Sequence, residues 1–104
     1  MIATKDILNR IEIDFEENAS KALAILDSAI LETEYLNQNR IIRCIIFLSK
    51  GNLEKLMKNI DVAIFDPRDV MMWAEYADGE FEKNLRRVRD FNNEFDKADK
   101  NVRQ

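Results

Sequence analysis

The chain has no histidine and only one cysteine among its 104 residues. Without histidine there can be no His-based catalytic triad and no Cys–His dyad, and the commonest metal ligand is missing. A single thiol, Cys44, cannot form an intramolecular disulfide, and it cannot assemble a structural zinc site alone. Carboxylates, lysine, arginine and tyrosine are left for chemistry. We therefore expect neither a metal ion nor a cofactor.

Glycine and proline are also scarce, with two and one residues respectively. All-β folds need many turn residues, so this chain favours helices. Its composition, 46% hydrophobic and 35% charged, is that of a globular protein, and its length is typical of one domain. We expect a single all-α domain over residues 1–104, with a polar C-terminal tail from about residue 96.

Cellular location is indicated by what the chain lacks. One cysteine and the absence of a signal-peptide pattern favour the reducing cytosol. The apolar run Cys44–Leu48 is far shorter than the roughly 20 residues that cross a bilayer, so no membrane contact is expected. A net charge of −4 argues against nucleic acid as a partner.

Apolar residues recur at the spacing of amphipathic helices along most of the chain. The segments are residues 4–17, 21–36, 40–50, 53–64 and 67–76, with a weaker final helix over 81–95. In the first segment, Ile11, Ile13 and Phe15 also alternate, which leaves a short strand as an alternative. Segment 40–50 is apolar around nearly its whole circumference and should be the central helix. Short connections predict five or six helices arranged as antiparallel hairpins.

Two helix starts carry clear signals. In "DPRDVMMWAEY", residues 66–76, Asp66 is a preferred N-cap, Pro67 suits the first helical position, and Asp69 complements the positive end of the helix dipole. Gly51 is a typical residue just beyond a helix end, and Asn52 is a typical cap for the next helix. These signals set the boundaries of the last long helices.

The stretch "GNLEKLMKNIDVAIFDP", residues 51–67, resembles the second half of a tetratricopeptide repeat. The matching residue types are Gly51, Asn52, Ala63, Asp66 and Pro67, with Phe47 at the position of the aromatic in the first helix. Leu56 and Cys44 depart from the pattern, as does the shorter spacing from Ala63 to Pro67, and no second copy occurs at a period near 34. Over residues 40–67 the resemblance implies a helical hairpin and a protein-binding role.

The helix after Pro67 also carries the main candidate site. Met, Trp, Tyr and Arg are typical of protein-binding surfaces. We expect Val70 and Trp73 to face the core while Met72 and Tyr76 share another side. A helix that simply packs into the core is the alternative. The predicted partner-binding residues are Arg68, Asp69, Met72, Trp73, Glu75 and Tyr76.

Charge alternates in blocks along the chain. Residues 1–38 carry three basic and eight acidic side chains, net −5, and residues 39–58 carry five and one, net +4. Residues 59–82 carry one and seven, net −6, and residues 83–104 carry seven and four, net +3. Such blocks can pair helices within one chain or orient two copies. The sequence thus predicts a small cytosolic protein that acts non-catalytically, by binding another protein or a second copy of itself.

Two other functional interpretations stay open. Asp66 or Asp69 with Glu75 could form the paired carboxylates of an enzyme. The basic and aromatic side chains of residues 86–95 could bind single-stranded nucleic acid; these are Arg86, Arg87, Arg89, Phe91 and Phe95. Cys44 is expected to be a buried structural thiol. The acidic series of the first helix lacks calcium-loop spacing and is expected to be solvated; it comprises Glu12, Asp14, Glu16 and Glu17.

Overall fold

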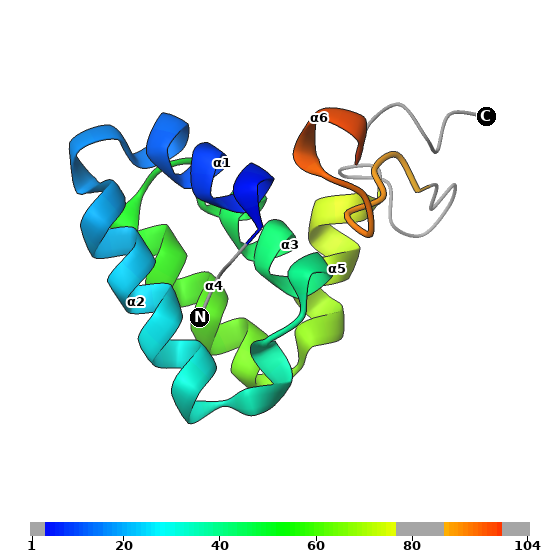
Figure 1. The fold of residues 1–104 in the computed structure, drawn as a ribbon. Helices are drawn as coiled ribbons and strands as arrows, with labels where there is room; N and C mark the ends of the chain where they lie inside the picture. The colour runs from blue at the N-terminus through cyan, green and yellow to red at the C-terminus, as the bar shows by residue number, and fades with distance from the viewer. Residues whose placement is uncertain (1–3, 77–86, 99–104) are drawn as a thin grey trace.

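A computed structural model describes residues 4–76 and 87–98 (Figure 1). Within these residues the chain forms helices and connecting segments and no strand. The elements are α1 (Lys5–Phe15), η1 (Glu16–Asn18), α2 (Ala19–Glu32), η2 (Glu34–Leu36), α3 (Asn39–Ser49), α4 (Leu53–Phe65), α5 (Pro67–Glu75) and α6 (Phe95–Ala98). The prediction of a small all-α domain built from antiparallel hairpins is confirmed. None of the described helices combines the length and apolar character that crossing a bilayer requires.

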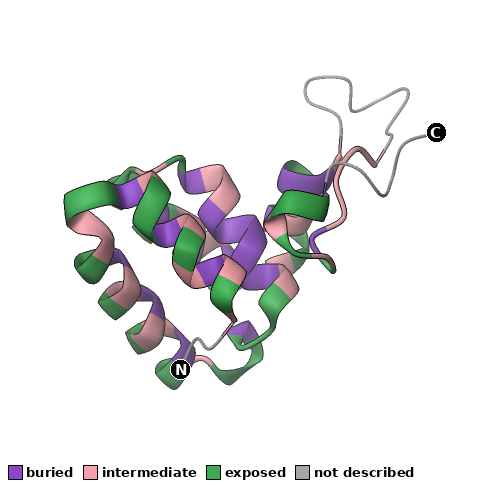
Figure 2. Cartoon of the chain, turned by 45° about the horizontal axis from the view of Figure 1, so that its top comes forward, coloured by how far each residue is buried: buried purple, intermediate pink, exposed green. Residues whose placement is uncertain are grey.

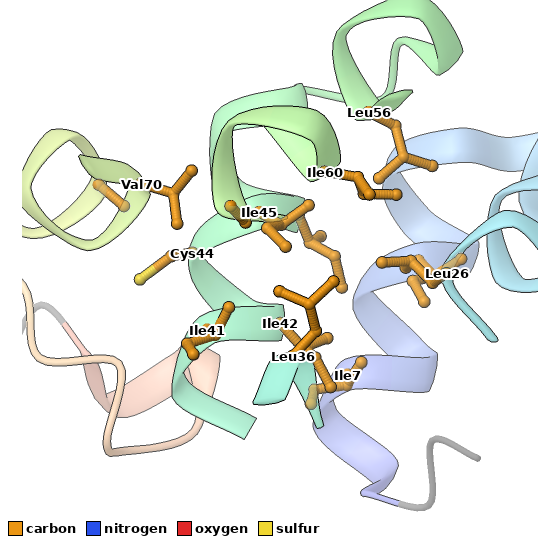
Figure 3. Close-up of a cluster of buried hydrophobic side chains, with 14 of the residues drawn as sticks. Ile7, Leu26, Leu36, Ile41, Ile42, Cys44, Ile45, Leu56, Ile60 and Val70 are labelled. Carbon is orange, nitrogen blue, oxygen red and sulfur yellow. The ribbon is translucent and has the colours of Figure 1, made fainter. Parts of the chain in front are cut away.

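Helix α3 lies at the centre, with α1, α4 and α5 packed against it (Figures 1 and 3). Its aliphatic residues are almost fully buried, as predicted for this segment: Ile41, Ile42, Ile45 and Ile46. The surrounding helices add side chains from every direction, among them Ile7, Leu26, Leu56, Ile60 and Val70. Figure 2 shows buried residues along α3, while α1 and α2 carry exposed residues on their outer faces. The core is therefore aliphatic and centred on one helix.

The ends of α2 differ from the sequence prediction. The helix begins at Ala19, because the short 3₁₀ turn η1 leads the chain from α1 almost directly into α2. It ends at Glu32 instead of continuing to Leu36, and η2 forms the last turn. Leu36 is only 1% exposed, so the change of helix type accompanies insertion of this side chain into the core.

The connection between α3 and α4 follows its sequence signals. Gly51 has a φ of +74°, in the left-handed region that favours glycine. A Cβ at this position would lie 2.1 Å from the backbone oxygen of Asp14, so the close approach to α1 also requires glycine. The Asn52 side chain accepts a hydrogen bond from the backbone N–H of Lys55 at 2.9 Å, which confirms the predicted cap.

The predicted final helix over residues 81–95 is wrong where the structure describes it. Residues 81–86 lie outside the described part, and residues 87–94 are not helical. Phe91 instead inserts into the core at 2% exposure, with its ring 5.4 Å from that of Phe47 and 5.5 Å from that of Phe95. Helix α6 then begins at Phe95, so Asp96 is helical rather than part of a tail, and Ala98 is fully buried. Aromatic packing, not local periodicity, determines this segment.

Candidate interaction surface

The start of α5 is set by Asp66, as the sequence predicts. Its carboxylate accepts the backbone N–H of Arg68 at 3.1 Å, and Pro67 occupies the first helical position. The Arg68 guanidinium also donates to both carboxylate oxygens, at 3.1 and 3.0 Å. These hydrogen bonds lower the pKa of Asp66 and raise the pKa of Arg68. The cap therefore also orients an arginine whose side chain is 82% exposed.

Helix α5 has one buried side and one exposed side. Val70 and Ala74 are fully buried against the core, whereas Met72 is 39% and Trp73 42% exposed. The prediction that Trp73 faces the core beside Val70 is therefore wrong. The segment 87–91 covers the side of α5 that carries Glu75, so the buried arc runs from Val70 toward Glu75 and leaves Trp73 outside it.

A hollow of about 330 Å³ lies beside this exposed side. Its lining residues are Arg40, Arg68, Met71, Met72, Glu75 and Tyr76. Four of the six predicted site residues are thus brought together, while Asp69 and Trp73 do not line the hollow. Sequence reasoning missed Met71, which lies next to a predicted residue, and Arg40. The latter comes from the first turn of α3, and no sequence signal links it to α5.

Glu75 departs from its predicted role as an exposed binding residue, because its side chain is fully buried. Its carboxylate accepts Nε and Nη2 of Arg40 at 3.0 and 2.6 Å and the backbone N–H of Phe91 at 3.0 Å. Arg87 lies 3.3 Å away. The hydrogen bond from Arg40 to this carboxylate raises the pKa of Arg40. Glu75 therefore holds the wall of the hollow in place and does not offer its charge to a partner.

Asp66 and Glu75, two of the carboxylates considered as an acid–base pair, are each bound to arginine. Among the described residues that line the hollow, Glu75 alone carries a carboxylate, and it is occupied by arginines and a backbone N–H. Asp66 is bound to Arg68, which lowers its pKa. A general acid working near neutral pH needs the opposite shift.

The remaining candidates are Cys44 and the acidic series at residues 12–17. Cys44 is a free thiol at 0% exposure, which confirms the prediction that it is buried, and burial raises its pKa. In the acidic series, Asp14 pairs with Arg10 at 2.9 Å, and Glu12, Glu16 and Glu17 are exposed. Over residues 4–76 and 87–98, no three acidic or cysteine side chains converge as metal ligands would.

The basic and aromatic residues near the C-terminus are engaged within the protein. Arg87 pairs with Asp90 at 2.6 Å, and Arg89 donates to the backbone oxygen of Ala74 at 3.0 Å. The guanidinium of Arg89 also lies 4.5 Å from the ring centre of Phe47. Phe91 is buried, so its ring is not available to stack on a base. Arg86 lies outside the described residues.

The helical hairpin of α3 and α4 occupies the residues that resemble a tetratricopeptide repeat. An antiparallel hairpin with a glycine stop is common to many helical folds, so this geometry does not identify a family. Comparisons with protein-family models, curated protein sequences and solved structures find no significant match for this chain.

Proposed function

We propose that this protein acts non-catalytically, by binding another protein through the outer side of α5. We call this the α5 surface: Arg68, Asp69, Met72, Trp73 and Tyr76. The observation that carries the proposal is the exposure of Met72, 39%, at the edge of a hollow of about 330 Å³, together with that of the adjacent Trp73, 42%. Large apolar side chains beside a hollow can both insert into a partner and receive one of its side chains.

The residue types of the α5 surface support this reading. Trp, Tyr, Met and Arg are enriched in protein interfaces, and Trp, Tyr and Arg dominate their binding energy. Arg68 is exposed, and the ion pair it makes with Asp66 at the surface contributes little stability. It can therefore turn toward a partner carboxylate at small cost.

The α5 surface is also held rigidly. Val70 and Ala74 anchor the inner side of the helix in the core, and Glu75 ties its C-terminal end to Arg40 of α3. A surface that is ordered before binding loses less conformational entropy on association. This favours recognition by α5 as a preformed element.

One feature of the chain accords with this role, and another bears on the compartment that we propose. The resemblance of residues 40–67 to a tetratricopeptide repeat implies a protein-binding function. The lone cysteine, Cys44, is buried as a free thiol, which suits the reducing cytosol that we propose as the compartment.

Affinity capture from native lysate tests the proposal. The bait is the full chain, compared with a Met72→Ser/Trp73→Ser variant and with Ile13→Ser, a matched control 70% exposed on α1. Circular dichroism and urea unfolding first establish that the three proteins are equally folded. We expect a protein captured by the wild type and by Ile13→Ser to be lost, at least tenfold, with the double variant. Equal recovery with all three would contradict binding through α5.

A photo-crosslinking residue gives a second measurement. Placed at position 73, it should join the captured protein to the chain, whereas the same residue at position 13 should not. Crosslinks from position 13 alone would place the binding surface on α1 instead. Because the crosslink is covalent, neither result depends on whether the complex survives washing.

A further inference from the structure

A second exposed surface runs along the outer face of α4. We call it the α4 stripe: Glu54, Met57, Lys58, Asp61, Ile64 and Phe65, all exposed. The opposite side of the helix, with Leu56, Ile60 and Ala63, packs into the core. At the helical repeat of about 3.6 residues per turn, the six residues form one continuous band.

The α4 stripe carries more apolar surface than a solvated helix face needs. Phe65 is 88% exposed, Met57 47% and Ile64 38%. Tyr35, 46% exposed, lies beside the end of the stripe, because its hydroxyl donates a hydrogen bond to the backbone oxygen of Ile64. Clustered large apolar side chains of this kind mark interaction sites.

The charges of the α4 stripe alternate in sign, with Glu54 negative, Lys58 positive and Asp61 negative. A partner with one sign of charge gains little from such a pattern. A second α4 stripe running antiparallel can place Lys58 of each copy opposite Asp61 of the other. We propose that the α4 stripe binds the α4 stripe of a second copy of this chain, across a twofold axis.

One register pairs two of the three charges and brings the apolar residues together, while Glu54 lies opposite Phe65 of the second copy at the two ends of the interface. Placing Lys58 opposite Asp61 of the second copy forms two equivalent ion pairs, because the twofold axis repeats each contact. The axis then passes between residues 59 and 60. At about 1.5 Å per residue, Ile64 and Phe65 come within about 3 and 4.5 Å, along the helix direction, of Met57 of the second copy. The three exposed apolar side chains of each stripe therefore meet in this register.

The size of the stripe sets the expected affinity. Helix α4 has thirteen residues and is about 20 Å long. A pair of such faces, widened by Tyr35, is comparable with the smaller specific interfaces, below about 1,600 Å² in total. We expect a dissociation constant on the order of 1–100 µM, typical of small interfaces with few buried anchors.

Sedimentation equilibrium of the full chain between about 1 and 500 µM tests the proposal, a range set by the expected affinity. The wild type should shift from the 12.2 kDa chain mass toward twice that value. Phe65→Ser should weaken association at least tenfold without loss of folding, since its side chain is exposed. Ile13→Ser should associate as the wild type does. A wild type that stays monomeric throughout would overturn the proposal.

Charge reversal tests the register itself. Lys58→Glu alone and Asp61→Lys alone should each weaken association, because like charges then face each other across the twofold axis. The double variant Lys58→Glu/Asp61→Lys restores both ion pairs and should restore association. Failure of the double variant to recover would overturn the register. Folding of each variant is checked by circular dichroism.

This inference stands apart from the α5 surface. Trp73→Ser should leave the sedimentation behaviour unchanged, and Phe65→Ser should leave capture by the α5 surface unchanged. Loss of self-association in Trp73→Ser would overturn the assignment of the interface to α4.

Discussion

Helix α3 holds two regions of the molecule in different ways. One region is the set of long helices packed around it, and the other is the segment of residues 87–98. The first region packs around the isoleucines of α3, which are nearly all buried. The second buries Phe91 and Ala98 in the core and is also tied to α3 by two of its arginines, each paired with an acid from another helix. Arg40 binds Glu75 of α5, and Glu75 accepts the N–H of Phe91. Helix α3 therefore supports both regions, through different faces.

The second arginine repeats the arrangement at α1. Arg43, only 5% exposed, donates Nε and Nη2 to the Asp6 carboxylate at 2.8 and 3.1 Å. Asp6 also accepts the N–H of Phe95 at 3.2 Å, and Arg43 donates to the backbone oxygen of Phe91. Each acid thus couples one arginine of α3 to one backbone N–H of the C-terminal segment. The difference teaches that apolar burial forms the helical body, while the C-terminal segment combines the burial of Phe91 and Ala98 with directional polar contacts.

The largest effect should come from breaking the aliphatic core. Ile45 is 1% exposed, and Ile45→Ala should lower the free energy of unfolding by about 2–5 kcal/mol, through lost burial and the cavity that remains. Urea denaturation measures the change. Ile13→Ala, at a 70% exposed position, is the control and should stay within about 0.5 kcal/mol. Similar losses in both variants would contradict a core centred on α3.

Removing one charge should loosen the C-terminal segment selectively. Glu75→Gln keeps the shape of the side chain but leaves Arg40 and Arg87 without their shared counter-charge. Both arginines are partly exposed, so we expect the free energy of unfolding to fall by about 1–3 kcal/mol, less than for breaking a fully buried ion pair. Hydrogen exchange at the Phe91 amide should accelerate about tenfold or more, since about 1.4 kcal/mol corresponds to tenfold.

The amide of Ile45 is the internal reference for that measurement, and Glu12→Gln, at an exposed position of α1, is the control variant. Exchange at Ile45 should change little in Glu75→Gln. Equal acceleration at Ile45 and Phe91 would mean that both regions open as one cooperative unit, which would remove the distinction between them.

Alkaline pH should destabilise the folded protein because the Cys44 thiol is harder to ionise in the folded state than in the unfolded chain. Burial raises the pKa of this thiol in the folded state above its unfolded value, so the folded protein keeps a proton that the unfolded chain releases. Stability is therefore full below about pH 8.5, the unfolded value, and falls above it by up to about 1.4 kcal/mol per pH unit. Urea denaturation of the wild type and Cys44→Ala between pH 8 and 10 measures the difference. If the free energy of unfolding changed with pH equally in both proteins, that result would contradict a raised pKa of Cys44.

The smallest effect should come from the exposed cap of α5. Hydrogen bonds from Arg68 lower the pKa of Asp66, so its stabilising contribution is present above the ordinary aspartate value and is lost as pH falls through the lower folded value. The carboxyl resonance of Asp66 in an NMR titration should therefore have a midpoint below about 3.9. Arg68→Gln should move the midpoint upward. A midpoint unchanged by that substitution would exclude Arg68 as the cause.

Local signals predicted the helices because each signal acts within a few residues. The spacing of apolar residues located α1, α3, α4 and α5, and the residue types of Gly51, Asn52 and Asp66 marked their ends correctly. Burial of Cys44 was likewise predictable, since a lone thiol in a largely apolar helical segment is usually buried. In the candidate site, Met72 and Tyr76 were correctly grouped, because residues four apart share a helix face.

The remainder depended on contacts between distant residues. Glu75 looked like an exposed acid until Arg40, 35 residues earlier, and Phe91, 16 residues later, enclosed it. Trp73 looked like a core residue because its spacing from Val70 is helical, but the C-terminal segment moved the buried arc away from it. Residues 87–94 are not helical, and Phe91 packs on Phe47 of α3, a contact between residues 44 positions apart that local periodicity does not reveal.

The sequence by itself determined the helical class, the order of the helices and the central position of α3, because propensity, periodicity and capping are local properties. Only the tertiary structure decided which charged residues are buried and which aromatic residues are exposed. Pairing Arg40 with Glu75 and Arg43 with Asp6 requires segments far apart in the chain to meet. Such pairing offsets the cost of removing charge from water only when the whole fold has formed.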